Sequence, residues 1–252
     1  MNIVKILAIG NSFSEDAVHY LYQMASSLGI DIKVVNLFIG GCSLERHWKN
    51  IENNEKAYLY QINGFKTERC VSIEEMLETE EWDYIVTQQA SHDSGWLNSY
   101  EPFIGLMVEY LKKKAPSAQI MLQETWAYEI NSSHGGFMRY NRSQQEMYQK
   151  IHKAYTTMER KYGLRLIPSG SVIQKVRQLP EFCIQEGGIS LCRDGFHLSF
   201  DYGRYLVTCV WLKTIFGINA KDITYFPESP NLTGIPEQKL LDILKDVVDL
   251  QE

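Results

Sequence analysis

Short apolar segments of strand length alternate with segments of helical periodicity along the whole chain. The predicted strands are Ile3–Ile9, Ile32–Phe38, Asp83–Gln88, Gln119–Gln123 and Leu164–Pro168. The predicted helices are Glu15–Leu28, Tyr100–Lys114, Asn141–Tyr162, Gly203–Phe216 and Pro236–Leu250. Short, mostly apolar strands separated by helices are typical of a parallel sheet that is covered on both faces. The sequence therefore predicts an α/β fold.

One segment departs from this alternation. Residues 57–62 and 65–71 have the pattern of two short strands around the tight turn Asn63-Gly64. We interpret residues 57–71 as a small β-hairpin insertion that decorates the sheet. Ser72 and Glu75 then have the spacing of a capping box for the next helix. Because no linker, repeat or low-complexity tract interrupts the chain, residues 1–252 are predicted to form a single domain.

Charge and cysteine content exclude several kinds of site. Lys and Arg number 25 against 31 Asp and Glu, a net charge of −6, whereas non-specific binding to a nucleic-acid backbone needs a basic face. The five cysteines are widely spaced without a CxxC pair, which indicates neither a zinc site nor a disulfide framework. The histidines are too scattered to be metal ligands. We therefore expect no nucleic-acid partner, no metal and no cofactor.

The sequence also gives no sign of a membrane partner. Its longest apolar runs are too short to span a bilayer, and no signal-peptide pattern follows Met1. If Met1 is the native start, the protein is expected in the cytoplasm. If a leader has been removed, the periplasm is the alternative.

Small, hydroxyl-bearing and amide residues follow the predicted strands, where ligands bind in an open parallel sheet. These segments are Gly10-Asn11-Ser12-Phe13-Ser14, Gly40-Gly41-Cys42-Ser43 and Gln88-Gln89-Ala90-Ser91. Ser12 lies just past a strand and at the start of a helix, which is the position of an exposed nucleophile. Taken alone, the first segment favours the simpler interpretation that Ser12 or Ser14 caps the helix. Cys42 has no nearby His–Asp pair, and we expect it to be buried.

Asp194 and His197 supply the partners that a serine nucleophile needs. They lie three residues apart on a loop that enters a helix near the C-terminus. The carboxylate can accept a hydrogen bond from His197 Nδ1–H, which leaves Nε2 free to take the serine proton. An Asp-x-x-His pair alone more often has a structural role, but its position after the last strand, combined with Ser12 after the first, favours a catalytic triad.

These segments resemble the sequence blocks of the SGNH (GDSL-type) hydrolases, which are esterases, acetylesterases, lipases and related enzymes. Gly10–Ser14 matches their Gly-Asp-Ser-Leu block, with Asn in place of Asp. Asn36 and Gly41 match the second block, and Asp194–His197 matches the Asp-x-x-His block. More narrowly, the chain resembles an uncharacterised Bacteroidetes-type branch of this family. The resemblance implies a three-layer α/β/α sandwich with a flavodoxin-like, five-stranded parallel sheet in the order 2-1-3-4-5.

The resemblance also implies a role for each matched residue. Ser12 is the expected nucleophile, His197 the base and Asp194 the carboxylate that orients it. The Ser12 and Gly41 N–H groups are the expected oxyanion donors.

The third block departs from the family pattern. The family has Gly-x-Asn-Asp after the third strand, and its Asn donates to the oxyanion, whereas this chain has Thr87-Gln88-Gln89-Ala90-Ser91. A glutamine has the same amide donor on one more methylene. We expect Gln88 or Gln89 to replace the missing Asn, and we prefer Gln88 because it lies closer to the strand.

Aromatic and polar residues near these loops are candidates for contact with a substrate. An aromatic rim suits a sugar ring, whereas packing in the core is the alternative, slightly favoured for Trp48 and evenly balanced for Trp126. The candidate substrate-binding residues are Asn11, His47, Ser91 and Trp126.

The sequence thus predicts a serine esterase that hydrolyses small acyl esters, with O-acetyl groups on a small carbohydrate molecule as the expected substrate. One alternative is a non-catalytic carbohydrate- or ligand-binding module on the same fold. Another is a lipase or thioesterase that acts on longer acyl chains.

Overall fold

The centre of the molecule is a seven-stranded sheet. The protein is described by a computed structural model that covers residues 3–251. In sheet order the strands are β4 (Phe65–Val71), β3 (Tyr58–Ile62), β2 (Ile32–Phe38), β1 (Val4–Gly10), β5 (Tyr84–Thr87), β6 (Gln119–Gln123) and β7 (Arg165–Ile167). Met1, on which the expectation about a leader rests, lies outside the described residues.

The five strands β2, β1, β5, β6 and β7 run parallel to one another. Counted along the chain without the hairpin, their order is 2-1-3-4-5, so the predicted flavodoxin-like arrangement is confirmed. Most residues of β1 and β2 are buried, as expected for central parallel strands that are covered on both faces.

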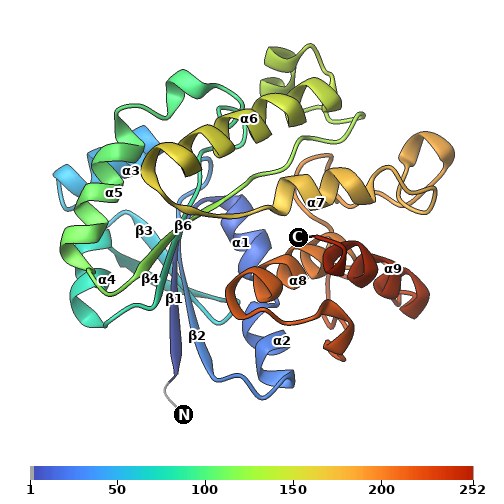
Figure 1. The fold of residues 1–252 in the computed structure, drawn as a ribbon, viewed down its shortest axis with the longest axis horizontal. Coiled ribbons are helices and arrows are strands. Elements are labelled where there is room, and N and C mark those ends of the chain that lie inside the picture. Colours follow the sequence, from blue (N-terminus) through green and yellow to red (C-terminus); the bar gives the residue numbers. More distant parts are fainter. Residues whose placement is uncertain (1–2, 252) are drawn as a thin grey trace.

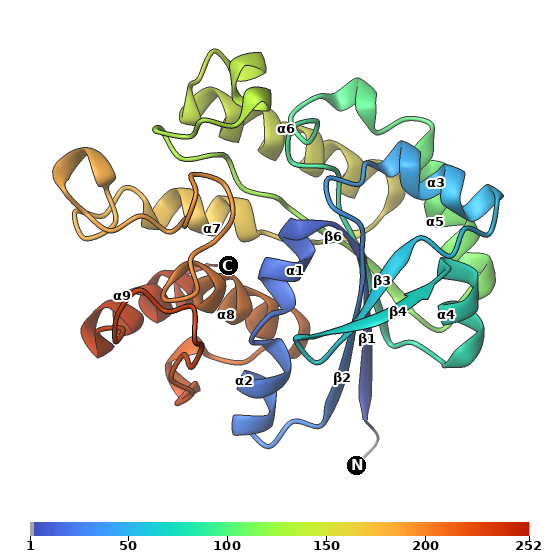
Figure 2. The same cartoon turned by 180° about the vertical axis from the view of Figure 1, so that it is seen from behind.

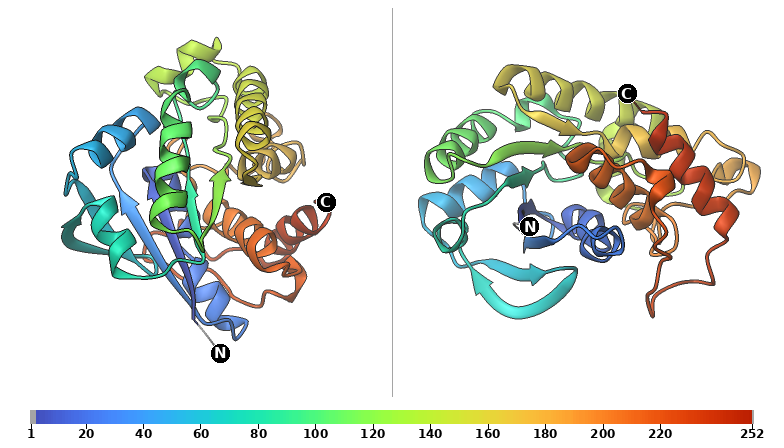
Figure 3. Two further views of the ribbon diagram at one scale, coloured as in Figure 1. Left: turned by 60° about the vertical axis from the view of Figure 1, so that its left-hand side comes forward. Right: turned by 60° about the horizontal axis from the view of Figure 1, so that its bottom comes forward.

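Helices cover both faces of the sheet. They are α1 (Ser12–Val18), α2 (Leu21–Ser27), α3 (Leu44–Glu52), α4 (Ile73–Thr79), α5 (Phe103–Lys114), α6 (Gln144–Tyr162), α7 (Ser169–Val176), α8 (Gly203–Phe216) and α9 (Gln238–Asp249). Figure 1 shows α3, α4 and α5 on one side of the sheet and α1, α2, α8 and α9 on the other, and Figure 3 shows the same layers from two further directions. The predicted three-layer sandwich is therefore confirmed.

Helix α8 is the central helix of the layer formed by α1, α2, α8 and α9. Nearly all of its side chains are buried. A surface helix, in contrast, buries only one apolar stripe. The helix packs against α1, α2 and α7 and is covered by α9.

Among residues 3–251, no helix is both long enough and apolar enough to cross a bilayer.

The hairpin of residues 57–71, predicted as a decoration on the sheet, supplies two further strands to it, so the sheet has seven strands rather than five. Strand β3 pairs antiparallel with β2, and β4 forms the edge (Figure 2). The turn is attached to β2 as well, because Asn63 N–H donates to Val34 O at 2.8 Å and Asn63 Oδ1 accepts from Val34 N–H at 2.9 Å. These backbone pairings, which the hairpin sequence does not reveal, extend the sheet.

The single helix predicted at Glu15–Leu28 is wrong, since α1 ends at Val18 and α2 begins at Leu21. Tyr20, at the break, is buried and donates its hydroxyl to Phe200 O at 3.1 Å. The hairpin turn also lies directly against the backbone carbonyl of His19 at this point. The break therefore results from contacts with distant segments.

Gly64 gives a test of this docking. Its φ is +85°, and a Cβ there would lie 2.4 Å from His19 O, whereas Gly29, with φ +72°, has nothing within 4 Å. Alanine at either position adopts a strained left-handed backbone, but Gly64→Ala must also displace the α1–α2 turn. We expect Gly64→Ala to lower the free energy of unfolding in urea by about 1–3 kcal/mol more than Gly29→Ala. Equal losses would show that the turn does not press on the helix break.

Candidate active site

The turn between β1 and α1 is capped by Asn11. Its Oδ1 accepts from Phe13 N–H at 3.0 Å, and its Nδ2 donates to Cys42 O at 3.0 Å. Ser14 is buried, with its hydroxyl 2.7 Å from Asn36 Oδ1. Because Asn11 provides the side-chain cap, the interpretation of Ser12 or Ser14 as the cap is wrong. The Ser12 hydroxyl is left available for another partner.

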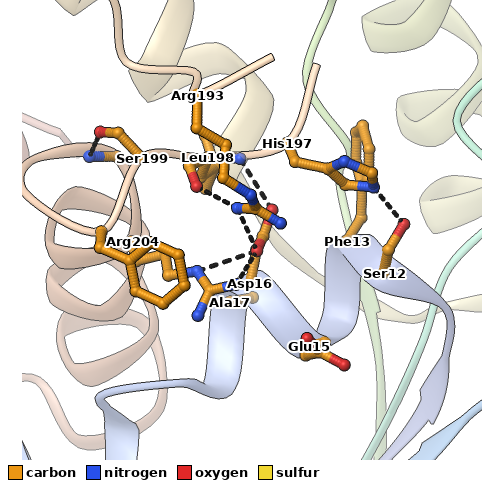
Figure 4. A network of polar contacts seen from close by, with 12 residues as sticks. Ser12, Phe13, Glu15, Asp16, Ala17, Arg193, His197, Leu198, Ser199 and Arg204 are labelled. Carbon is orange, nitrogen blue, oxygen red and sulfur yellow. Dashed lines mark hydrogen bonds and ion pairs between the residues drawn. The ribbon is translucent and has the colours of Figure 1, made fainter. Parts of the chain in front are cut away.

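That partner is His197. Ser12 Oγ lies 2.8 Å from His197 Nε2, and His197 Nδ1 lies 2.7 Å from Asp194 Oδ2. Figure 4 shows the imidazole facing the hydroxyl across the start of α1. The ionised carboxylate accepts from Nδ1–H, so Nε2 is the acceptor for the serine proton. The structure thus brings together the three residues that the sequence analysis selected.

Asp194 remains ionised in this arrangement. Its partial burial opposes the charged form, but hydrogen bonds from the His197 ring and from the His197 and Phe196 N–H groups outweigh this effect. Together they hold the pKa of Asp194 below its ordinary value. A stable negative charge therefore lies on the side of the imidazole away from the serine.

The segment after β6 supports the Asp194–His197 loop. Glu129 N–H donates to Gly195 O at 2.8 Å, and Trp126 Nε1–H donates to Phe196 O at 2.8 Å. Gly195 has a φ of +85°, and a Cβ there would lie 2.9 Å from Ser132 Cα. The loop is thus held at two consecutive carbonyl groups, those of Gly195 and Phe196.

Two backbone N–H groups, those of Ser12 and Gly41, have no acceptor among the described residues. As the first residue of α1, Ser12 has no intrahelical acceptor for its N–H. Gly41 lies in the exposed turn after β2 with a φ of +61°, and within residues 3–251 its N–H donates to no backbone carbonyl.

The two glutamines after β5 have different environments. Gln89 is buried, with Oε1 accepting from Leu44 N–H at 3.0 Å and Nε2 donating to Ser99 O at 2.9 Å. Its amide is committed to joining three loops and is not free to act as an oxyanion donor. Gln88 is also buried, and its Nε2 donates to Asn11 Oδ1 at 2.8 Å. The second N–H of the Gln88 side-chain amide has no acceptor among the described residues.

His47 does not lie on a substrate-accessible surface, which corrects its selection as a substrate-binding residue. Its ring is fully buried and stacks on Tyr58, and Nδ1 lies 2.9 Å from the Tyr58 hydroxyl. Burial, with a smaller contribution from Arg46, lowers the pKa of His47 to about 3. Cys42 is buried beside it, and this burial raises the pKa of the thiol to about 12, so a thiolate nucleophile is not available there.

Two further candidates for substrate contact are also interior residues. Trp126 is fully buried and stacks on Phe13 at 4.1 Å between ring centroids, so of the two alternatives for this residue the core position holds. Asn11 is buried, with its amide used in the turn that precedes Ser12. Ser91 is half-buried, and its hydroxyl lies 2.8 Å from that of Tyr128. The aromatic residues after β6 therefore contact the Asp194–His197 loop through Phe196 rather than forming an exposed rim.

Asp16 is not among the residues predicted from the sequence, yet its buried carboxylate contacts both sides of the Asp194–His197 loop (Figure 4). The available signal was its position four residues after Ser12, one helical turn along α1.

Among residues 3–251, no group of three or more His, Cys, Asp or Glu side chains has the arrangement needed to hold a metal ion.

Residues 5–234 match a family model described as "Domain of unknown function (DUF4886)". The chain belongs to the DUF4886 family. A crystal structure of a DUF4886 family protein from Bacteroides uniformis ATCC 8492 is 37% identical, with a TM-score of 0.88 over 98% of this chain and 94% of that one. No functionally curated protein has a sequence that matches this chain.

More distant structural neighbours share the fold of this chain. A protein from Slackia heliotrinireducens assigned to the SGNH hydrolases is 21% identical, with a TM-score of 0.58 over 85% of this chain and 100% of that one. An acetylxylan esterase from Geobacillus stearothermophilus is 15% identical, with a TM-score of 0.57 over 86% of this chain and 97% of that one. The resemblance to SGNH hydrolases is therefore confirmed, at the level of the fold.

The buried His47 predicts a pH dependence of stability. Its pKa is about 3 in the folded protein against an ordinary value of 6.5, so between these values the unfolded chain binds a proton that the folded protein excludes. Stability must then fall as pH decreases through this window, by up to about 1.4 kcal/mol per pH unit for one such group. In urea unfolding between pH 7 and pH 4.5, His47→Gln should show a shallower decrease than the wild type.

His152 provides the matched control, because it has the opposite sign. A hydrogen bond to Glu124 raises the pKa of His152, so its contribution is complete below the ordinary value and is lost as pH rises through the folded value. His152→Gln should leave the decrease toward acid pH at least as steep as in the wild type, because the wild-type His152 opposes that decrease. An unchanged slope for His47→Gln would contradict the buried, neutral state of His47.

Proposed function

We propose that this protein is a serine esterase that hydrolyses small acyl esters, with O-acetyl groups on carbohydrate as the preferred substrate. The observation that carries the proposal is the continuous chain of contacts from Ser12 Oγ to His197 Nε2 and from His197 Nδ1 to Asp194. This connectivity is the one that activates serine in triads on unrelated folds.

The reaction follows from these contacts. Ser12 Oγ attacks the ester carbonyl carbon while its proton passes to His197 Nε2, and the carboxylate of Asp194 stabilises the resulting imidazolium. As the tetrahedral intermediate collapses, His197 returns the proton to the departing alcohol and an acyl-Ser12 ester remains. Water, deprotonated by His197, then attacks this ester, and a carboxylic acid leaves with Ser12 restored.

The negative charge of the tetrahedral intermediate needs donors that are already in place. The unpaired N–H groups of Ser12 and Gly41 are the two backbone donors in this proposal. The free N–H of the Gln88 amide is the third, in place of the family's Asn. Because the Gln89 amide is committed to Leu44 and Ser99, Gln89 is not part of the proposed oxyanion hole.

The substrate class rests on two kinds of support. One neighbour of the same fold is an acetylxylan esterase. In this chain the loops around Ser12 supply polar groups, among them the exposed Gly40-Gly41 turn and the half-buried Ser91, which suit a hydroxyl-rich leaving group more than an aliphatic chain.

Replacing the nucleophile is the direct experiment. Ser12→Ala should lower kcat/KM on p-nitrophenyl acetate by about 10⁴-fold or more, because no other hydroxyl is activated by His197. Ser14→Ala is the matched control, since Ser14 lies one residue beyond Phe13 but bonds only to the interior. Ser14→Ala should lose stability and keep kcat within a few-fold of the wild type. Retained activity in Ser12→Ala would make the protein something other than a serine esterase of this design.

Acyl chain length tests the substrate class. Acetyl esters should have a higher kcat/KM than octanoyl or longer esters, because the groups around Ser12 give no aliphatic slot in which added methylenes gain binding energy. A series of p-nitrophenyl esters together with acetylated xylo-oligosaccharides measures this preference. A preference for long chains would instead indicate a lipase or thioesterase, and turnover of none of these esters a ligand-binding module.

A further inference from the structure

We propose that Asp16 is a positioning residue for the catalytic histidine, acting through the two residues that flank the Asp194–His197 loop. The inference rests on the proposed function, because it concerns the same site. Asp16 lies one helical turn after Ser12 on α1, and its side chain is fully buried.

The contacts of Asp16 enclose the catalytic loop. Oδ2 accepts from Leu198 N–H at 2.7 Å, and Leu198 directly follows His197. Oδ1 accepts from Arg193 Nη1 at 3.0 Å, and Arg193 directly precedes Asp194. The same Arg193 nitrogen also donates to Leu198 O, and Arg193 N–H donates to His197 O at 2.9 Å. One carboxylate on the nucleophile's own helix therefore holds both ends of the segment that carries His197 (Figure 4).

A second arginine fixes the carboxylate itself. Arg204, on α8, donates from Nε to Asp16 Oδ1 at 2.9 Å, and its Nη2 lies 2.6 Å from the same oxygen in an ion pair. The guanidinium of Arg204 is almost completely buried and lies over the Phe200 ring at 3.8 Å. Charge-assisted hydrogen bonds of this kind are short and directional. Asp16 can therefore move relative to α8 and the loop only by breaking a buried ion pair.

The Asp16 contacts affect the distance between His197 and Ser12. Asp194 and His197 lie on one loop and keep each other in place, but nothing within that loop sets its distance from Ser12. The Glu129 and Trp126 contacts hold the middle of the loop, whereas the Asp16 contacts tie both of its ends to the helix that carries Ser12. Misplacement of a reacting group by about 1 Å costs about 10²-fold in rate. Loss of the Asp16 charge should therefore separate His197 from Ser12 without altering either group.

The test uses Asp16→Asn in the full-length protein. We expect a folded variant whose kcat on p-nitrophenyl acetate is about 10²-fold lower with KM within about twofold of the wild type, because the interaction acts on the reacting geometry. Glu124→Gln is the matched control: its carboxylate is also fully buried and bonded, to His152 and to Ser171 N–H. It should lose comparable stability and keep kcat. An Asp16→Asn variant with normal kcat would overturn the proposal.

Arg193→Gln keeps the proposal testable if Asp16→Asn does not fold. The Arg193 side chain is 31% exposed, and its removal leaves the Asp16–Arg204 pair and the Leu198 contact intact. We expect kcat to fall about tenfold with KM unchanged, since one end of the loop is released. An unchanged kcat in a folded Arg193→Gln protein would contradict the proposal that the Asp16 contacts at both ends of the loop position His197.

A spectroscopic measurement separates this proposal from the proposed function. Replacing Ser12 by Ala removes the hydrogen bond to His197 Nε2 and should shift the ¹⁵N resonance of that nitrogen. In the Asp16→Asn background (or Arg193→Gln, if that variant replaces it) the same replacement should produce a much smaller change, because the hydrogen bond is already lost. Equal changes in both backgrounds would overturn the positioning role even if the wild type turned over no ester, whereas failure of ester turnover alone would overturn the esterase.

Discussion

The buried carboxylate of Asp16 joins the first helix of the fold to a loop 182 residues farther along the chain. Strand β1 lies at the centre of the sheet, and the side-chain cap supplied by Asn11 starts α1 and leaves the half-buried Ser12 hydroxyl available. Neither feature brings His197 to Ser12. That contact forms because α1 carries both the hydroxyl and the carboxylate, and because Arg204 of α8 fixes the carboxylate from the other side.

The chain departs from the SGNH sequence blocks at two places, and in this structure those places touch. Asn11 stands where the family has Asp, and Gln88 follows the third parallel strand where the family has Asn. Gln88 Nε2 donates to Asn11 Oδ1 at 2.8 Å, and Asn11 Oδ1 also accepts from Phe13 N–H. The longer amide at position 88 is therefore linked directly to the cap that orients the start of α1. Gln88 serves the turn before Ser12 in addition to the donor role proposed for it.

Local pattern determined what could be predicted from the sequence. The five parallel strands were found because each is a short apolar run, and the candidate triad because Ser12, Asp194 and His197 follow strands in recognisable blocks. The break at His19–Tyr20 and the pairing of the hairpin with β2 depend on contacts between distant segments, which periodicity does not report. His47 and Trp126 have residue types that suit a binding surface, but packing against Tyr58 and Phe13 places them inside. Asp16 was missed because its partners, Arg193, Leu198 and Arg204, lie far along the chain.

Activation of the Ser12 hydroxyl by His197 can be tested directly by covalent labelling. A fluorophosphonate probe reacts with an activated serine and leaves an inert one unmodified, so peptide mapping after labelling identifies the reactive side chain. The account predicts a single modification at Ser12 in the folded protein and none after unfolding in urea. A folded protein that is not labelled, or that is labelled at a different serine, would contradict it.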